Sequence, residues 1–293
     1  MALHIYAAAR GAELLRWHDE KLKDEIVLNR EIIMKKIILT TAIMFALGGV
    51  ANAQTVKLGT EGGIYAPWNF IDDNGKIAGF EIDLGNDLCK RAKIECEWVI
   101  NEWDTIIPNL VAGNYDAIIA GMSITDERKQ NIDFTQDYYP PYSSRFLMLA
   151  NTKVDFNNLK GVKIGVPADT IQEDYVQKKF AKENMIFPDE GGFAFKGMKD
   201  LIAGNIDILF NDASYLALLV EELNVSLIFG GSDVFLGDDV GVGIGLRKGD
   251  SELKAKLNKA IDEAKADGSL DALIEKWFKK GRYALKRDQY VKY

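Results

Sequence analysis

Two residues of opposite charge follow two similar stretches of this chain. The stretches read NLVAGNYDAIIA at 109–120 and DLIAGNIDILFN at 200–211. Arg128 comes shortly after the first stretch, and Asp212 comes directly after the second. A guanidinium can bind a carboxylate through two hydrogen bonds, and a carboxylate can bind an ammonium group. If both residues face one cleft, the pair would suit a zwitterion.

Each stretch predicts a short amphipathic helix followed by a strand. The helices would end at Ala-Gly-Asn, where Gly113 and Gly204 can adopt the left-handed conformation that closes many helices. The strands would run over 115–120 and 206–210, which are apolar nearly throughout, as expected for parallel strands covered on both faces. Ligands of open α/β sheets bind beyond the carboxyl ends of the strands. We therefore expect a ligand between two similar lobes, at the loops that follow these strands.

The remaining pattern alternates strands and helices, which predicts an α/β protein with mostly parallel sheets and right-handed crossovers. An aromatic, Pro-containing segment at 134–142 and a segment rich in Gly and Asp at 230–245 would connect the lobes. We assign 54–140 together with 238–293 to the first lobe and 141–237 to the second. Two such connections would form a hinge.

Composition argues against several classes of protein. The 293 residues are 47% hydrophobic and 27% charged, which is typical of a soluble globular protein with room for two domains. A formal net charge of −8 makes nucleic acids and anionic membrane surfaces poor partners. We expect no ATP binding, because no Gly-rich loop ends in Gly-Lys-Ser or Gly-Lys-Thr.

A secretory signal peptide is predicted at 34–53. It has a basic start at Lys35 and Lys36, an apolar run at 37–50 and a small-residue cleavage site at 51–53. The apolar run is shorter than the roughly 20 residues of a membrane span, and the alternative is a buried core helix. Cleavage after Ala53 would release the protein into the bacterial periplasm, with no direct membrane insertion afterwards.

Residues 1–33 precede this signal peptide, which should itself lie at the N-terminus. We interpret them as a start assigned too far upstream; the alternative is a genuine amphipathic helix. Both histidines, His4 and His18, lie before the cleavage site. The exported protein would therefore lack Ser–His and Cys–His nucleophile pairs and His-containing metal sites, and we expect no cofactor.

The two cysteines of the chain, Cys89 and Cys96, lie close together in the sequence. In an exported protein such a pair predicts a disulfide, and the alternative is two reduced, packed thiols. A disulfide closing so short a loop would contribute on the order of 2 kcal/mol. A metal site would need further ligands, which the neighbouring sequence does not supply.

The segment GFEIDLGNDLCKRA, at 79–92, resembles the signature of the solute-binding proteins that serve ABC transport of polar amino acids. The resemblance continues, in order, through GTEGGIYAPWNF, EWDTIIPNL, AGMSITDERKQNIDFT, GVPADTIQEDY and GVGIGLRKGDSEL. It implies a two-lobed periplasmic-binding-protein fold of type II, with each lobe a sheet flanked by helices. It also implies delivery of an amino acid to an inner-membrane ABC permease with its ATPase.

The resemblance implies a ligand site as well. Arg128 matches the Arg that binds the ligand's α-carboxylate, and Asp212 matches the acid that binds its α-ammonium. Tyr65 and Trp103 match the aromatic walls around the ligand's side chain, and Glu61 matches an acidic position near its far end. The other positions expected beside the ligand are Ala120, Gly121, Ser123, Thr170 and Gln172.

Several of these assignments have simpler alternatives. Arg128 could form a surface ion pair, and Trp103 could pack in the core. Thr170, at a predicted helix N-terminus, could offer hydroxyl and backbone N–H donors to a carboxylate, or it could only cap the helix.

The site favours a basic amino acid, such as Lys, Arg or ornithine. A cationic side chain between aromatic rings and next to a carboxylate combines a cation–π contact with an ion pair. The two cysteines also resemble the disulfide of the basic-amino-acid branch. However, Ala120 and Gly121 stand where that branch often has Ser, and Ile171 stands where Thr is common. Glutamine, histidine or another polar amino acid is the alternative.

A different class of function stays open, because this fold family also contains dehydratase-like enzymes and sensory domains. Glu61 and Asp212 could perform acid–base chemistry in an enclosed cleft. We find no residue beyond those needed for binding, and we therefore predict a monomeric binding protein rather than an enzyme.

Overall fold

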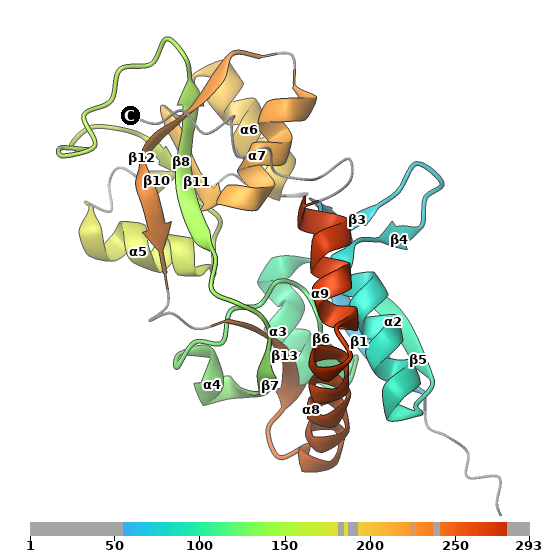
Figure 1. The fold of residues 1–293 in the computed structure, drawn as a ribbon. Coiled ribbons are helices and arrows are strands. Elements are labelled where there is room, and N and C mark those ends of the chain that lie inside the picture. Colours follow the sequence, from blue (N-terminus) through green and yellow to red (C-terminus); the bar gives the residue numbers. More distant parts are fainter. Residues whose placement is uncertain (1–54, 181–184, 187–192, 224, 237–240, 280–293) are drawn as a thin grey trace, which may run out of the picture. The chain divides into compact units, whose positions relative to one another are not determined.

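The computed structural model describes residues 55–180, 185–186, 193–223, 225–236 and 241–279. The predicted signal peptide and the segment before it lie outside these residues. Two five-stranded sheets and one small three-stranded sheet form the framework (Figure 1).

The first sheet has the strand order β5 (Cys96–Asn101), β1 (Val56–Glu61), β6 (Ala117–Ile118), β13 (Val242–Arg247) and β7 (Ile132–Tyr139). The second has the order β10 (Met185–Ile186), β9 (Ile164–Gly165), β11 (Ile208–Asp212), β8 (Ser143–Leu149) and β12 (Leu227–Phe235). The small sheet consists of β2 (Ile64–Tyr65), β3 (Asn69–Ile71) and β4 (Ile77–Ala78).

Both large sheets combine parallel and antiparallel pairing. In the first, β5, β1 and β6 are parallel, whereas β13 pairs antiparallel with β6 and β7. In the second, β10, β9 and β11 are parallel, whereas β8 pairs antiparallel with β11 and β12. The antiparallel pairs involve the strands that carry the chain between the sheets, from β7 to β8 and from β12 to β13. The expected α/β fold is confirmed, with more antiparallel pairing than the pattern of apolar strands indicated.

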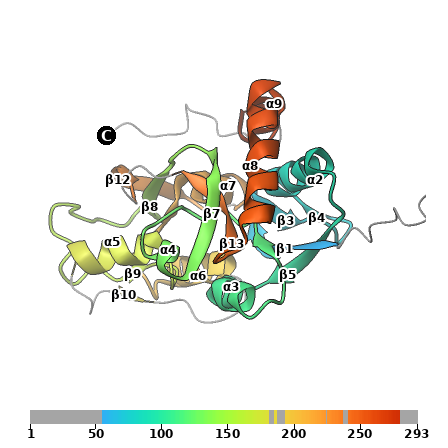
Figure 2. The same cartoon turned by 90° about the horizontal axis from the view of Figure 1, so that it is seen from below.

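Helices cover both faces of the first sheet (Figure 2). On one face lie α2 (Phe80–Ala92), α8 (Ser251–Ala266), α9 (Ser269–Ile274) and a π-helical turn (Glu275–Lys279). The helix α2 forms because Phe80, Leu84 and Leu88 recur every four residues, and all three are fully buried in this core. On the other face lies α3 (Trp103–Val111), which packs through Ile106 and Leu110.

The second sheet is covered in the same way. The helices α6 (Phe193–Ala203) and α7 (Ala213–Glu222) contribute to one apolar core, and α5 (Ile171–Lys179) contributes to another. The short helix α4 (Arg128–Asn131) follows β6. Within the described ranges, no helix combines the length and the apolar composition needed to cross a membrane.

The repeated stretch forms the same structure twice. Gly113 ends the α3 copy with φ 83° and Gly204 ends the α6 copy with φ 74°, so both glycines are left-handed as predicted. In each copy an aspartate then accepts a hydrogen bond from a backbone N–H: Asp116 from Lys57, on β1, at 2.8 Å, and Asp207 from Lys163, directly before β9, at 2.7 Å. The strand boundaries differ from prediction, since β6 is only Ala117–Ile118 and β11 continues through Asp212.

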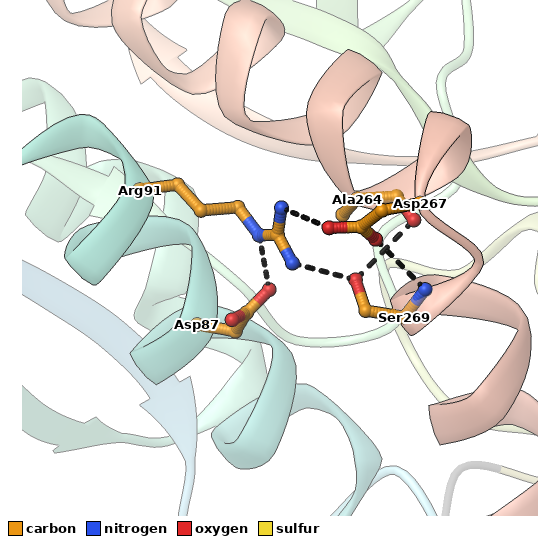
Figure 3. A network of polar contacts seen from close by, with 5 residues as sticks. All are labelled: Asp87, Arg91, Ala264, Asp267 and Ser269. Atoms are coloured by element: carbon orange, nitrogen blue, oxygen red, sulfur yellow. Dashed lines mark hydrogen bonds and ion pairs between the residues drawn. The ribbon is translucent and has the colours of Figure 1, made fainter.

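A disulfide and a set of polar contacts made by Arg91 hold α2 in place. The Cys89–Cys96 disulfide joins its end to β5, which confirms the predicted pairing over reduced thiols. Arg91 binds Asp87 at 2.6 Å and reaches the turn between α8 and α9, where it binds Asp267 at 2.7 Å and Ser269 at 2.8 Å (Figure 3). Hydrogen bonds from the Ser269 backbone and from Arg91 lower the pKa of Asp267 to about 2.

Candidate functional site

Several of the predicted site residues lie at or just after the carboxyl ends of strands. Glu61 ends β1, the segment 120–123 follows β6, and Asp212 ends β11. Tyr65, on β2, donates its hydroxyl to Oδ2 of Asp212. Residues from the two large sheets therefore meet in this region.

Asp212 is a buried carboxylate that is bound by neutral donors. It is 5% exposed, and its Oδ1 accepts a hydrogen bond from Nε2 of Gln172 at 2.6 Å. Its Oδ2 accepts from the Tyr65 hydroxyl and, at 3.5 Å, from the Tyr142 hydroxyl. Burial raises the pKa of Asp212 to about 6, although these hydrogen bonds favour the charged form. No Lys or Arg of the described chain pairs with it, so an ammonium group would supply the missing countercharge.

The position of Asp212 is determined by its surroundings and not by helix capping. It precedes α7 at the N-cap, but its side chain makes no capping hydrogen bond. Gln172 also donates to the Ser144 hydroxyl at 3.0 Å, which fixes the amide group beside the carboxylate. Gln172 therefore acts here as a partner of Asp212.

The segment after β6 is held by a second buried acid, Glu81. This residue is fully buried, and it accepts hydrogen bonds from the Gly121 N–H at 2.5 Å, from Asn69 at 2.7 Å and from the Tyr138 hydroxyl. Burial raises the pKa of Glu81 despite these three donors. Glu81 belongs to the sequence signature at 79–92, and its contacts suggest that this acid positions the backbone of the segment.

Gly121 has a local structural reason for being glycine. Its φ is +61°, and a Cβ atom at this position would lie 3.0 Å from Cε1 of Tyr65. A serine would therefore press against the Tyr65 ring in this arrangement. The neighbouring Ala120 is 1% exposed and packs in the core below α3, so only its backbone is suited to a ligand contact.

Arg128 extends from α4 toward the start of α5. Its guanidinium donates to the Ser123 carbonyl at 3.1 Å and to the Asp169 carbonyl at 3.4 Å, and its Cζ lies 5.2 Å from the Trp103 ring centroid. Burial lowers the pKa of Arg128, but a guanidinium stays charged near neutral pH. No carboxylate of the described residues forms an ion pair with it, so the surface ion pair considered from the sequence is not found.

Trp103 and Thr170 line the same cavity as this guanidinium. Trp103 is partly buried and donates from Nε1 to the Asp169 carbonyl at 3.3 Å. The Thr170 hydroxyl accepts from the Glu173 N–H at 3.2 Å and donates to the Pro167 carbonyl at 2.7 Å. The hydroxyl thus serves the cap of α5, and a ligand contact would have to come from the Thr170 backbone.

A cavity of about 460 Å³ lies between α3, α4 and the start of α5, and its lining includes Trp103, Arg128 and Thr170. Asp212 is not among the residues that line this cavity, and its carboxylate accepts a hydrogen bond from the Tyr65 hydroxyl. The cavity therefore marks the guanidinium side of the site.

Glu61 is a second acid without a countercharge. It is partly buried, and within the described part of the chain its carboxylate has no hydrogen bond or ion pair. Burial, followed by repulsion from Glu102 and Glu81, raises the pKa of Glu61 to about 7. A cation bound next to Glu61 would relieve this repulsion.

The sequence model of the bacterial extracellular solute-binding proteins, family 3, matches residues 56–280. The chain belongs to this family. One relative is the lysine/arginine/ornithine-binding periplasmic protein of Escherichia coli (strain K12), which is 35% identical over 260 residues that cover 84% of this chain and 97% of the relative.

Solved structures of family relatives share the fold. A periplasmic His/Glu/Gln/Arg/opine family-binding protein from Silicibacter pomeroyi, in complex with lysine, is 44% identical with a TM-score of 0.67, over 81% of this chain and 100% of that one. An ancestral amino acid-binding protein, a precursor of cyclohexadienyl dehydratase, is 29% identical with a TM-score of 0.66, over 79% of this chain and 99% of that one. The two-lobed fold expected from the sequence is confirmed for this solute-binding protein.

Sequence reasoning missed four residues that contact the candidate site residues of this solute-binding protein. They are Glu81, Tyr142, Ser144 and Asp169. Tyr142 stood in the aromatic segment that was interpreted only as a connection between lobes. Glu81 stood in the signature itself, in the first turn of α2 together with Asp83, and the sequence does not show that only Glu81 of the two is buried.

Proposed function

We propose that this solute-binding protein binds a basic amino acid in the bacterial periplasm and delivers it to an inner-membrane ABC transporter. The observation that carries the proposal is the charge pattern of the site. Asp212 and Glu61 are carboxylates without a cationic partner in the described chain, and Arg128 is a cation without a carboxylate partner. Two positions for cations and one for an anion match an α-amino acid with a cationic side chain.

In the proposed complex each charge has one task. Arg128 binds the α-carboxylate, for which its planar guanidinium offers paired donors. Asp212 binds the α-ammonium, and Glu61 binds the cationic end of the side chain. Tyr65 and Trp103 flank the apolar part of the ligand, with Ser123 and the Gly121 backbone beside it.

Binding and closure are coupled in this proposal. Arg128 and Glu61 belong to segments of the first sheet, whereas Asp212 ends a strand of the second. A ligand that contacts all three has its full set of contacts only when the lobes are close together, so it favours the closed form. A transporter that recognises the closed form would receive loaded protein only. The periplasmic relatives support the proposed compartment.

One observation favours a second candidate, a neutral polar amino acid such as glutamine. With a pKa of about 7, Glu61 is partly protonated at neutral pH, and a neutral carboxyl can hydrogen-bond to an amide. Catalysis is not part of the proposal, because each polar group of the site has a task in holding a zwitterion.

The test is a thermal-shift screen of the protein, refolded to remove bound ligand, against the twenty amino acids, ornithine and citrulline. A ligand at about 100 times its Kd adds roughly 2.7 kcal/mol and raises the Tm by a few degrees. We expect Arg, Lys and ornithine to give the largest shifts and citrulline, the neutral analogue of arginine, a smaller one. Larger shifts with neutral amino acids would overturn the specificity, and no shift at all would overturn the binding function.

A further inference from the structure

A buried tyrosine next to the site has a hydroxyl without a partner. Tyr215 lies on α7, three residues after Asp212, and it is 0% exposed. Among the described residues nothing hydrogen-bonds to its hydroxyl. Buried polar groups are nearly always paired, and leaving one unpaired destabilises the folded protein. The hydroxyl therefore needs an explanation that folding alone does not supply.

The surroundings of Tyr215 connect it to Glu61. Its ring centroid lies 5.6 Å from that of Tyr65, whose hydroxyl is bound to Asp212. Burial, and then the negative charge of Glu61, raise the pKa of Tyr215 above its ordinary value. The Glu61 carboxylate lies beside the backbone of its own loop, where a Cβ atom on Gly63 would be 3.4 Å from Oε1. The Tyr215 hydroxyl and the Glu61 carboxylate each lack a hydrogen-bond partner in the described chain, and Glu61 stands four residues before Tyr65.

This pair is separate from the Arg128 side of the site. The Arg128 guanidinium is bound to the Ser123 and Asp169 carbonyls, and no hydrogen bond or ion pair of the described residues connects it to Glu61. Asp212 stands between the two regions, because Tyr65 contacts both Asp212 and Tyr215. An amino acid bound through Asp212 and Arg128 would direct its side chain away from the guanidinium, toward the region of Glu61.

We propose that the Tyr215 hydroxyl, together with Glu61, binds the cationic end of the ligand's side chain and is a specificity-determining group of this protein. The proposal rests on the function proposed above. An ammonium group has three N–H donors and a guanidinium has five, more than one carboxylate oxygen can accept. The hydroxyl oxygen accepts one of these donors, while its own proton can be donated to Glu61.

The alternative is that Tyr215 only packs in the apolar core. Its ring does belong to the core formed with Leu216, Leu219 and their neighbours. A phenylalanine would fill this core equally well, and its ring would lack the unpaired hydroxyl. The substitution Tyr215→Phe therefore separates packing from ligand recognition.

The experiment compares Tyr215→Phe with the unmodified protein, using calorimetric titration with arginine and with lysine and chemical unfolding without ligand. We expect the affinity for both ligands to fall about tenfold, as for loss of a hydrogen bond to a charged group, while stability without ligand is unchanged or higher. The matched control is Tyr115→Phe, because the buried Tyr115 hydroxyl donates to the Ile106 carbonyl. The control should lose stability and keep its affinity.

A second measurement places both residues on the same part of the ligand. In a Glu61→Gln background, Tyr215→Phe should weaken arginine binding less than tenfold, because interacting groups are not additive. Unchanged arginine affinity in Tyr215→Phe, or full additivity with Glu61→Gln, would overturn this inference and leave the proposed function standing. If the unmodified protein binds neither arginine nor lysine, the proposed function fails, and this inference fails with it.

Discussion

The affinity of this protein for arginine should rise steeply with pH between 5.5 and 8. The pKa values of Glu61 and Asp212 are raised to about 7 and about 6, so both carboxyls are largely protonated at pH 5.5. A cationic ligand binds the charged form of each. Binding must therefore release protons below these pKa values, and acid must weaken binding.

The size of the effect follows from the two pKa values. Between pH 8 and pH 5.5, a carboxyl with a pKa of about 7 reduces cation affinity roughly 30-fold, and one with a pKa of about 6 reduces it roughly fourfold. Together they predict a loss of about 100-fold for arginine. At pH 7, Glu61 is half protonated, so about half a proton should be released for each arginine bound.

Calorimetric titration measures both quantities. Affinity is recorded across the pH range, and proton release is obtained at pH 7 from two buffers with different heats of ionisation. The variant Glu61→Gln should weaken arginine binding and retain only the roughly fourfold dependence that Asp212 provides. If the protein binds glutamine, that neutral ligand should show the same shallow dependence. An arginine affinity that is independent of pH, or an undiminished dependence in Glu61→Gln, would refute the role given to Glu61.

Further predictions concern stability and single side chains. Without ligand, the raised pKa of Glu61 means that its charged form destabilises the fold. From this residue, the free energy of unfolding measured with a chemical denaturant should be about 1.4 kcal/mol higher at pH 6 than at pH 8. The variant Glu61→Gln should remove that difference. Asp212→Ala should abolish calorimetrically detectable binding, because an unpartnered buried ammonium costs several kcal/mol; near-normal affinity would remove Asp212 from the site. Arg91→Ala should lower the Tm through loss of the contacts in Figure 3 and leave arginine affinity unchanged, and a changed affinity would contradict a purely structural role.

The sequence predicted the local structures best where one residue type decides the conformation. Gly113 and Gly204 closed their helices as expected, because left-handed φ values strongly favour glycine. Strand direction was less predictable, since an apolar run does not show whether its neighbour is parallel. This is why the antiparallel pairing of β13 and β8 was not anticipated.

For the candidate site, too, local features could be predicted from the sequence and tertiary contacts could not. Arg128 and Asp212 were predicted as site residues because they follow strands, and the topology of an α/β sheet places ligands beyond strand ends. Glu81 and Ser144 were missed because their importance comes from partners far away in the sequence, Gly121 for Glu81 and Gln172 for Ser144. Tertiary contacts of this kind leave no periodic pattern in the chain.

The direction of the pKa shifts separates a structural carboxylate of this protein from the two that we propose bind the ligand. Asp267, which is paired with Arg91 and with backbone donors, has its pKa lowered to about 2, so its negative charge is favoured by the fold. Glu61 and Asp212 have pKa values raised mainly by burial, so their negative charges are disfavoured until a cation arrives. The Tyr215 hydroxyl, whose ring contacts Tyr65, has no hydrogen-bond partner in the described chain, and its burial destabilises the fold as well. These groups weaken the unliganded fold, and they lie near the ends of strands from both sheets. A ligand with a complementary charge pattern would offset this loss of stability, which best explains why the groups are there.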